Sequence, residues 1–450
     1  MWQNLLQKNK KVKTILFIVD VKSRDLASIA LISYYLKKKY KVIYGRVNEL
    51  EDYIDKKFDC VILPKMNRFD DTFKYFIFET IRKKRIIICI ENEGNINVKI
   101  KKNFLFVPHL FFFWGKNQLK NYKDTFAKKK NIKIMGNPRL DFFHKRFNSL
   151  LIDKKSYLKQ NNLKNNFCLT FTTRTQEAHK SLSLISNIAK RRSYMYVEPK
   201  KYFKDYANSA KKMLILTENI IFEISKKFPK INLLIKPHPG ENLKYWNNLQ
   251  RKIPNLRIIK GMTLENFLQL SDLNISQNIC SSTFEAKLMK LKTIELQTSF
   301  VKKYSNKIHQ QLADYVALDT NKFFSIFEKL MKNREKKIYK HKKLKKYIDN
   351  FFYKFDGLRC RDYAKEIDRF LRNQSHNKIK FDLNSNQSKE LQRLKIKFEK
   401  KEVNKKKFNL KKILSDLLPM NKDKLKYDNK FRYDHRYNIN DEKIWYKKFD

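Results

Sequence analysis

Glycine and proline are scarce in this chain of 450 residues, which contains only 7 glycines and 9 prolines. Such scarcity excludes a collagen-like protein and a chain dominated by flexible or proline-rich linkers. The sequence also contains neither a GxGxxG fingerprint nor a Walker-type glycine-rich loop, so neither of these nucleotide-binding motifs is expected. An apolar fraction of 42% is sufficient for a globular protein with two or three domains.

Cysteine usage excludes a disulfide framework and a zinc site. The five cysteines are odd in number and widely separated, without a CxxC motif or a Cys/His cluster: Cys60, Cys89, Cys168, Cys280 and Cys360. This pattern is typical of a reducing compartment, so we expect a cytoplasmic protein. The sequence has no DxD-type acidic pair either, and we therefore expect neither a metal ion nor a cofactor.

Long apolar runs are absent as well. The most apolar patch, residues 104–114, is too short to span a bilayer and contains His109. Lysines within residues 8–13 precede only a short apolar run that ends at Asp20, which does not fit a signal peptide. We therefore expect a protein that is soluble or bound peripherally at the inner face of the cell membrane.

Acidic residues are few, because 45 Asp and Glu face 101 Lys and Arg, for a formal net charge of +56. A charge of this sign attracts nucleic acid or an anionic membrane surface. Here the basic residues are spread along the whole chain, and the excess of Lys, Asn, Ile, Phe and Tyr is typical of an AT-rich genome. We therefore expect no specific nucleic-acid partner, but peripheral contact with anionic lipid is compatible with the charge.

What the sequence does contain is two series of apolar runs that alternate with helix-length segments. Such alternation predicts repeated β-α units and parallel sheets. The expected strands are 14–20, 41–46, 60–64, 86–91, 105–108 and 132–136 in the first series, then 167–172, 231–236, 256–260, 273–276 and 293–296 in the second. We predict an α/β protein with a GT-B-like architecture, in which two Rossmann-type domains face each other across a cleft.

The predicted domains follow from these series. Residues 1–150 form the first Rossmann-like domain and residues 151–307 the second. Residues 308–372 are expected to be a helical closing segment, because their apolar spacing is helical. Residues 373–450 are expected to be a charged tail that is loosely ordered or helical.

Two polar loops follow strands of the second series. One is Lys236–Asn242, which contains Lys-Pro-His-Pro, and the other is Ser281–Glu285. Loops at neighbouring strand ends of one parallel sheet lie at its carboxyl edge, where such sheets bind ligands. Lys236 and His238 can donate to phosphate, and Ser281 begins a helix whose free N–H groups attract anions. The alternatives are a proline-fixed turn and an ordinary capping box.

Acidic residues follow a strand of the first series, in the segment Glu91–Asn95. A carboxylate at a strand end that faces a cleft suits a general base acting on an acceptor hydroxyl. We favour Glu93 over Glu91, and the alternative is an ordinary turn. Thr172, Thr173 and Arg174 likewise end a strand, and they either contact phosphate or are solvated loop residues.

Ser23 and Arg24 follow the first predicted strand. They either bind an anionic acceptor or phosphate, or serve only to cap the following helix. His109, His144 and His179 stand alone without partner spacing, so we expect none of them to be catalytic.

Several short motifs together resemble bacterial surface-carbohydrate biosynthesis proteins of GT-B type, which make capsule or surface polysaccharide. They are Ser23–Leu26, Glu91–Gly94, Trp114–Gly115, Gly136–Asp141, His238–Asn242 with Trp246, and Cys280–Ala286. The sequence is more distantly similar to sialyltransferases, capsule Kdo transferases and CDP-glycerol glycerophosphotransferases. These motifs run in the family's order over about residues 14–300, so residues 373–450 lie outside the resemblance.

The resemblance implies roles for individual residues. Glu93 corresponds to the base, although Glu-Asn-Glu-Gly replaces the relatives' Asp-Asp-Gly and leaves the choice between Glu91 and Glu93 open. The donor-binding set is Thr172, Thr173, Arg174, Lys236, His238, Pro239, Glu241, Asn242, Ser281, Ser282, Thr283 and Glu285. Ser23 and Arg24 are the acceptor-side candidates.

The expected function is transfer of a sugar from a nucleotide-sugar, such as a CMP-linked one, to a surface polysaccharide or lipid-linked glycan. The reaction is expected to be metal-independent and inverting. The alternatives are a CDP-glycerol-type phosphotransferase or a sugar-nucleotide epimerase on the same fold, and, from another class, a basic nucleic-acid-binding protein or a scaffold.

Overall fold

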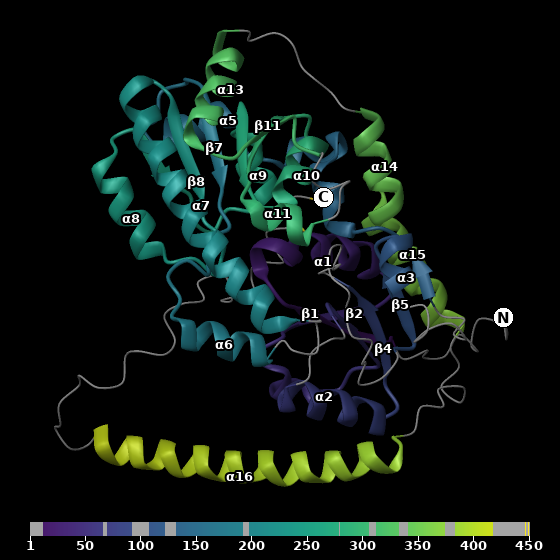
Figure 1. Ribbon diagram of the computed structural model, residues 1–450. Helices are drawn as coiled ribbons and strands as arrows, with labels where there is room; N and C mark the ends of the chain where they lie inside the picture. The colour runs from purple at the N-terminus through teal and green to yellow at the C-terminus, as the bar shows by residue number, and fades with distance from the viewer. Residues whose placement is uncertain are drawn as a thin grey trace, which may run out of the picture.

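The computed structural model describes residues 12–65, 70–91, 108–121, 132–191, 198–278, 280–305, 312–332, 341–373 and 383–416, together with Tyr446 and Phe449. Two parallel six-stranded sheets, each flanked by helices, lie one above the other, the first in the lower and the second in the upper half of Figure 1. The predicted fold class, two Rossmann-like domains in a GT-B-like α/β protein, is confirmed.

The first sheet is built from strands whose apolar runs are buried on both faces, as is usual for parallel strands. Its strands are β1 Thr14–Val19, β2 Lys41–Arg46, β3 Cys60–Leu63, β4 Ile86–Ile90, β5 Leu110–Phe113 and β6 Ile132–Ile134, in the order β2-β1-β3-β4-β5-β6. Helix α1 (Lys22–Leu36) covers one face and α2 (Asp71–Arg82) covers the other. The strand order reverses between β1 and β3. From β1 the chain moves to β2 at one edge of the sheet, and from β3 it moves through β4 and β5 to β6 at the other edge.

The second sheet has the strand order of a dinucleotide-binding Rossmann domain. Its strands are β7 Cys168–Thr172, β8 Asn232–Lys236, β9 Leu256–Ile258, β10 Leu273–Gln277, β11 Lys292–Leu296 and β12 Tyr315–Ala317, in the order β12-β11-β10-β7-β8-β9. Helices α7 (Pro199–Lys227), α8 (Leu243–Lys252) and α13 (Thr320–Lys332) pack on one face, and α5 (Lys154–Gln160) and α9 (Leu264–Gln269) on the other. The order reverses between β7 and β10.

Two strands differ from the sequence-based expectation. The expected strand 105–108 lies mostly outside the described residues, and the strand that pairs with β4 is Leu110–Phe113 instead. His109 anchors the start of this strand. Its backbone N–H donates to the carbonyl of Ile87 at 2.8 Å, and its ring Nδ1 accepts from the backbone N–H of Ile87 at 2.9 Å. Strand β12 was not expected within the helical segment 308–372, since three residues are too short to show a period.

Two helices return the chain from the second domain to the first, and both are visible on the right of Figure 1. Helix α14 (His341–Phe351) packs against α3 (Lys116–Asn121), and α15 (Arg359–Asn373) packs against α1. The crossing chain passes so close to Gly115 that a Cβ there would lie 2.5 Å from the carbonyl carbon of Phe351. Gly115, which belongs to one of the motifs that carry the family resemblance, therefore has a packing role at this crossing.

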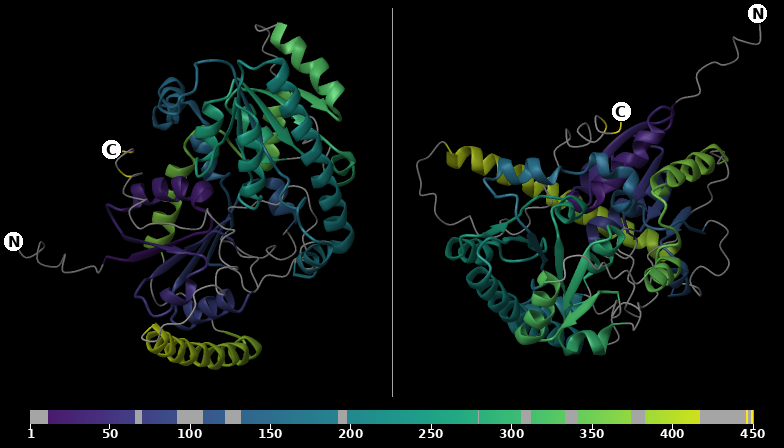
Figure 2. Two further views of the ribbon diagram at one scale, coloured as in Figure 1. Left: turned by 90° about the vertical axis from the view of Figure 1, so that its left-hand side faces the viewer. Right: turned by 90° about the horizontal axis from the view of Figure 1, so that it is seen from above.

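The long helix α16 (Ser385–Asp416) lies within the predicted charged tail. Figures 1 and 2 show it along the outer side of the first domain, beside α2 and away from the second sheet. Leu391, Leu394 and Phe398 join the core on that face of the first sheet, and Lys397 donates to Asp71 of α2 at 2.5 Å. This part of the tail is therefore helical and packed.

Gly136→Ala tests the close approach at the crossing. Gly136 has φ +86°, and a Cβ there would meet the carbonyl oxygen of Phe352 at 2.6 Å. An alanine would be strained in this left-handed backbone conformation, and its Cβ would overpack the contact. Because these two costs add, we expect a loss of about 2–4 kcal/mol in the free energy of unfolding, measured by denaturant titration. Gly261→Ala is the matched control, since Gly261 also has a positive φ, +69°, but nothing within 4 Å. Equal losses in the two variants would mean that the contact with Phe352 is unimportant.

Candidate functional site

The carboxyl edge of the second sheet carries a cluster of hydroxyl groups at the point where the strand order reverses. Thr172 ends β7, and its hydroxyl lies 2.7 Å from the hydroxyl of Ser282 in α10 (Ser281–Leu288), which follows β10. Thr283 is tied to Ser276 of β10 by a 2.5 Å hydrogen bond. These bonds fix the start of α10 against the strand ends.

The loop after β8 is held to the same strand end by a buried carboxylate. Glu241 accepts hydrogen bonds from the hydroxyl of Thr173 at 2.6 Å, the N–H of Thr175 at 2.5 Å and the indole of Trp246 at 2.7 Å. Burial raises the pKa of Glu241, and these hydrogen bonds oppose the rise. The carboxylate therefore braces the loop from within the fold.

The two predicted donor loops are not at neighbouring strand ends, because β7 lies between β8 and β10. Two threonines at the end of β7 connect them: Thr172, its last residue, contacts α10, and Thr173, which follows it, contacts Glu241 in the loop that contains His238. The sequence could not show that β7 lies between β8 and β10, because β8 and β10 are adjacent neither along the chain nor in the sheet. The structure does place both loops on one edge around β7.

His238 is exposed at the tip of its loop, between Pro237 and Pro239. Its Nδ1 accepts the N–H of Gly240 at 3.2 Å. In a neutral imidazole an accepting Nδ1 leaves the proton on Nε2. Nε2 is therefore the nitrogen that can donate to a phosphate oxygen.

Other predicted donor residues are occupied elsewhere. Lys236 donates to the carbonyl of Met262, and Asn242 caps α8 by accepting the N–H groups of Lys244 and Tyr245. The Arg174 guanidinium donates to the carbonyl of Asn278 at 2.9 Å and to the hydroxyl of Tyr206 at 3.1 Å. The side chain of Arg174 thus stabilises the turn after β10.

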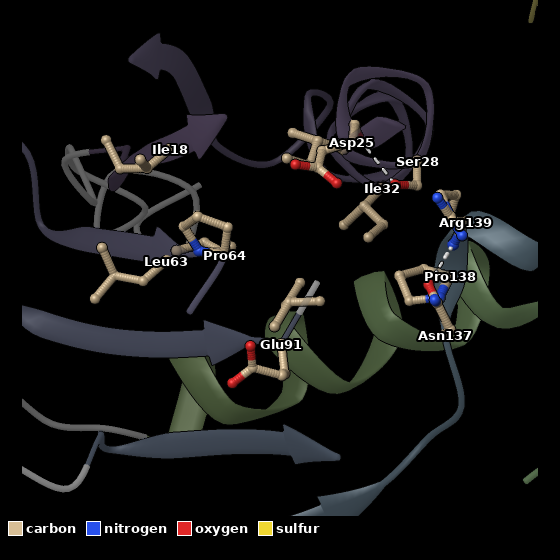
Figure 3. A pocket seen from close by; sticks show the side chains of 13 residues that line it. Ile18, Asp25, Ser28, Ile32, Leu63, Pro64, Glu91, Asn137, Pro138 and Arg139 are labelled. Carbon is tan, nitrogen blue, oxygen red and sulfur yellow. Dashed lines mark hydrogen bonds between the residues drawn. The ribbon is translucent and has the colours of Figure 1, made fainter. Parts of the chain in front are cut away.

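At the carboxyl edge of the first sheet lies a small cavity of about 30 Å³, shown in Figure 3. Its polar lining comes from Asp25 and Ser28 of α1, Glu91 after β4, and Asn137 and Arg139 after β6. The cavity adjoins the ends of β1 and β3, between which the strand order of this sheet reverses. Both sheets therefore carry a polar cluster at the position where open α/β sheets bind ligands.

Glu91 reaches this cavity from the end of β4 and is 3% exposed. Its backbone carbonyl accepts the indole N–H of Trp114, which fixes the main chain at that point. Glu93, our preferred base, lies outside the described residues. The structure thus places one of the two candidate bases in the cavity.

Arg24 is balanced by neighbouring carboxylates. Its guanidinium lies 3.1 Å from Asp20 and 2.8 Å from Asp25, and Lys65 also reaches Asp20 at 2.7 Å. Asp25 in addition accepts the N–H of Val21 at 2.9 Å and so helps to begin α1. The N-cap of α1 is Val21, so Ser23 lies within the helix and does not cap it, and binding of an anion by Arg24 stays a prediction.

The motif Gly136–Asp141 joins the two domains, and its residues were not among our predicted site residues. Arg139 crosses to the second domain and forms an ion pair with Glu285 of α10. Asp141 accepts the N–H groups of Arg359 and Cys360 at 3.0 and 2.7 Å, which begins α15. Burial raises the pKa of Asp141 to about 6. The sequence showed the motif itself, but it gave no signal that Glu285 of the other domain would be the partner of Arg139.

An apolar cluster built from residues of both domains includes Leu140 and Phe284, the chain neighbours of this ion pair. Phe284 of α10 stacks on Phe352 with ring centroids 4.5 Å apart, and Trp114 after β5 stacks on the other side at 5.6 Å. Leu140 and Phe143 belong to the same cluster. Helix α10 and the cavity that contains Glu91 therefore lie at one junction between the domains.

Within the described ranges, no group of three or more His, Cys, Asp or Glu side chains is arranged to hold a metal ion. No helix in the same part of the chain combines the length and the apolar character needed to cross a bilayer.

Comparisons with known proteins give structural matches. No protein-family model matches the sequence, and no curated protein matches it. A Listeria monocytogenes protein assigned as a UDP-N-acetylglucosamine 2-epimerase superposes with a TM-score of 0.50 at 12% identity, over 81% of this chain and 98% of its own. The wall teichoic acid polymerase TagF superposes with a TM-score of 0.49 at 12% identity, over 83% and 92%. At such identity the first likeness concerns the fold alone, and that fold is the GT-B arrangement of two Rossmann-like domains.

Proposed function

We propose that the protein is a glycosyltransferase that moves a sugar from a nucleotide-sugar donor, such as a CMP-linked one, to a surface polysaccharide or lipid-linked glycan. The reaction needs no metal ion and inverts the anomeric centre. It takes place at the junction, with the donor on the second domain and the acceptor on the first. The surplus of basic residues favours peripheral contact with anionic lipid, where a lipid-linked acceptor would be found.

One observation carries this proposal. The strand order of each sheet reverses beside a polar cluster, and the Arg139–Glu285 ion pair joins the two clusters at one junction. A nucleic-acid binder or a scaffold has no need for two such edges that face each other.

The chemistry follows from the two sides of the junction. On the donor side, Nε2 of His238 and the N-terminus of α10 stabilise the negative charge that develops on the leaving phosphate. On the acceptor side, a carboxylate removes the proton of the acceptor hydroxyl. Glu91, which lines the cavity, and Glu93 are the two candidates for that role.

A thermal-shift screen with CMP, CDP, UDP, GDP and their sugars tests the donor side, because a bound ligand raises the unfolding temperature by mass action. We expect one nucleotide series to stand out. His238→Ala should weaken binding of that nucleotide by roughly 10–100-fold, the cost of about 1.5–3 kcal/mol for a hydrogen bond to a charged group.

His179→Ala is the matched control, since His179 is another exposed histidine of the same domain and its ring contacts Tyr245. It should bind as the unaltered protein does. An undiminished shift in His238→Ala would remove His238 from the donor site. Product analysis separates the rival reactions, because an epimerase acts on the nucleotide-sugar without an acceptor and a phosphotransferase forms a phosphodiester.

A further inference from the structure

Arg139 sits on a rigid support. Asn137 accepts the N–H of Arg139 at 3.0 Å, and Pro138 fixes the first turn. Two residues further on, the buried Asp141 is bound to the start of α15. The backbone of Arg139 is thus fixed to the end of β6 and to the crossing helices at once.

The guanidinium of Arg139 lies among buried carboxylates. Glu285, its ion-pair partner, is 1% exposed, and Glu265 of α9 is 4% exposed. Burial raises the pKa of Glu265, and the charge of Arg139 is among the influences that lower it. Among the residues that the structure describes, Nε of Arg139 is buried and has no hydrogen-bond partner. One donor of the fork is therefore unsatisfied in the structure.

The same guanidinium lies between the two halves of the candidate site. Glu285 follows the start of α10 by about one turn, and the hydroxyl of Ser281 lies 3.3 Å from its second carboxylate oxygen. Arg139 also lines the cavity that contains Glu91, as Figure 3 shows. An oxyanion bound at the N-terminus of α10 would consequently lie within reach of Arg139.

We propose that Arg139 is a donor-binding residue contributed by the first domain, whose guanidinium exchanges its ion pair with Glu285 for an oxyanion of the nucleotide-sugar. This inference rests on the proposed function and adds a residue to its donor site. The planar fork of arginine matches phosphate and carboxylate groups. The oxyanion is either the leaving phosphate or a carboxylate of the transferred sugar. In both cases the bound donor touches both domains and lies directly beside the cavity with Glu91.

A purely structural ion pair makes a different prediction. If Arg139 and Glu285 only hold the domains together, Arg139→Ala and Glu285→Gln should change the affinity for the ligand in the same direction. If Arg139 binds the donor, Glu285 competes with the ligand for the guanidinium. Glu285→Gln then strengthens donor binding, whereas Arg139→Ala weakens it.

The test is calorimetric titration of the full chain with CMP, with CDP or UDP, and with a CMP-linked sugar acid. We expect Arg139→Ala to weaken binding at least tenfold, Arg139→Lys to restore only part of it, and Glu285→Gln to strengthen it several-fold. Arg146→Ala, an exposed arginine nearby on η4 (Lys145–Leu150), should change nothing. Unfolding temperatures measured without ligand show whether each variant is folded, and Arg139→Lys carries the test if Arg139→Ala is not.

The outcomes separate the possibilities. Weaker binding of every nucleotide by Arg139→Ala assigns the leaving phosphate, and weaker binding of the sugar acid alone assigns its carboxylate. Unchanged binding in Arg139→Ala, or equal weakening in Arg139→Ala and Glu285→Gln, overturns the inference. If His238→Ala still weakens binding in that case, the proposed function stands without Arg139. If the unaltered protein binds none of these compounds, both fail.

Discussion

Glu91→Gln is expected to reduce turnover by roughly 10²–10⁴-fold, the usual contribution of a general base. The amide keeps the size of the side chain and its place in the cavity, but it cannot accept the proton of the acceptor hydroxyl. Donor binding should stay unchanged, because the donor loops lie on the other domain. The measurement is kcat with the donor identified by the nucleotide screen, together with calorimetric binding of that donor.

Glu79→Gln is the matched control. Glu79 is a 5% exposed carboxylate of the same domain, on α2, where it pairs with Arg82 at 2.8 Å. We expect it to keep its turnover. Glu93→Gln decides between the two candidate bases, since only the base should show the full loss. Full turnover in Glu91→Gln with a large loss in Glu93→Gln would transfer the role to Glu93.

Lys287→Met is expected to cost about 3–5 kcal/mol in the free energy of unfolding, because it leaves a buried carboxylate without its partner. Lys287 of α10 and Asp314 are 3% and 1% exposed, and their charged atoms lie 2.6 Å apart. Asp314 also accepts the N–H of Thr293 in β11 at 2.9 Å. The pair fixes α10 against β11, so the donor-side helix should loosen as well. Denaturant titration measures the loss.

Two further variants identify the cause of that loss. Lys303→Met removes an ion pair of similar length, 2.5 Å to Asp205, that is 49% and 32% exposed, and it should cost less than about 1 kcal/mol. Adding Asp314→Asn to Lys287→Met removes the unpaired charge and keeps an acceptor for Thr293, so part of the stability should return. A double variant no more stable than Lys287→Met would contradict the electrostatic explanation.

The sequence predicted most of the fold because parallel strands are buried on both faces and appear as continuous apolar runs. Ile86–Ile90 and Cys168–Thr172 are examples, with every residue buried. The pattern did not predict β12, a three-residue strand, because periodicity needs length. The expected strand 105–108 lies mostly outside the described residues.

The candidate site was only partly predictable for a related reason. The loops at His238 and Ser281 follow apolar strands, so their shared edge could be predicted from local pattern. The brace by Glu241 and the ion pair of Arg139 with Glu285 join residues that are distant in sequence or belong to different domains. Local pattern carries no information on such contacts.

A crystal structure of the protein with the nucleotide selected by the screen tests the central claim most directly. The account predicts that the leaving phosphate lies between Nε2 of His238 and the N-terminus of α10, and that the sugar faces Glu91 across the junction. A nucleotide bound elsewhere, such as in the hollow lined by Tyr157, Arg257 and Lys260, would contradict it.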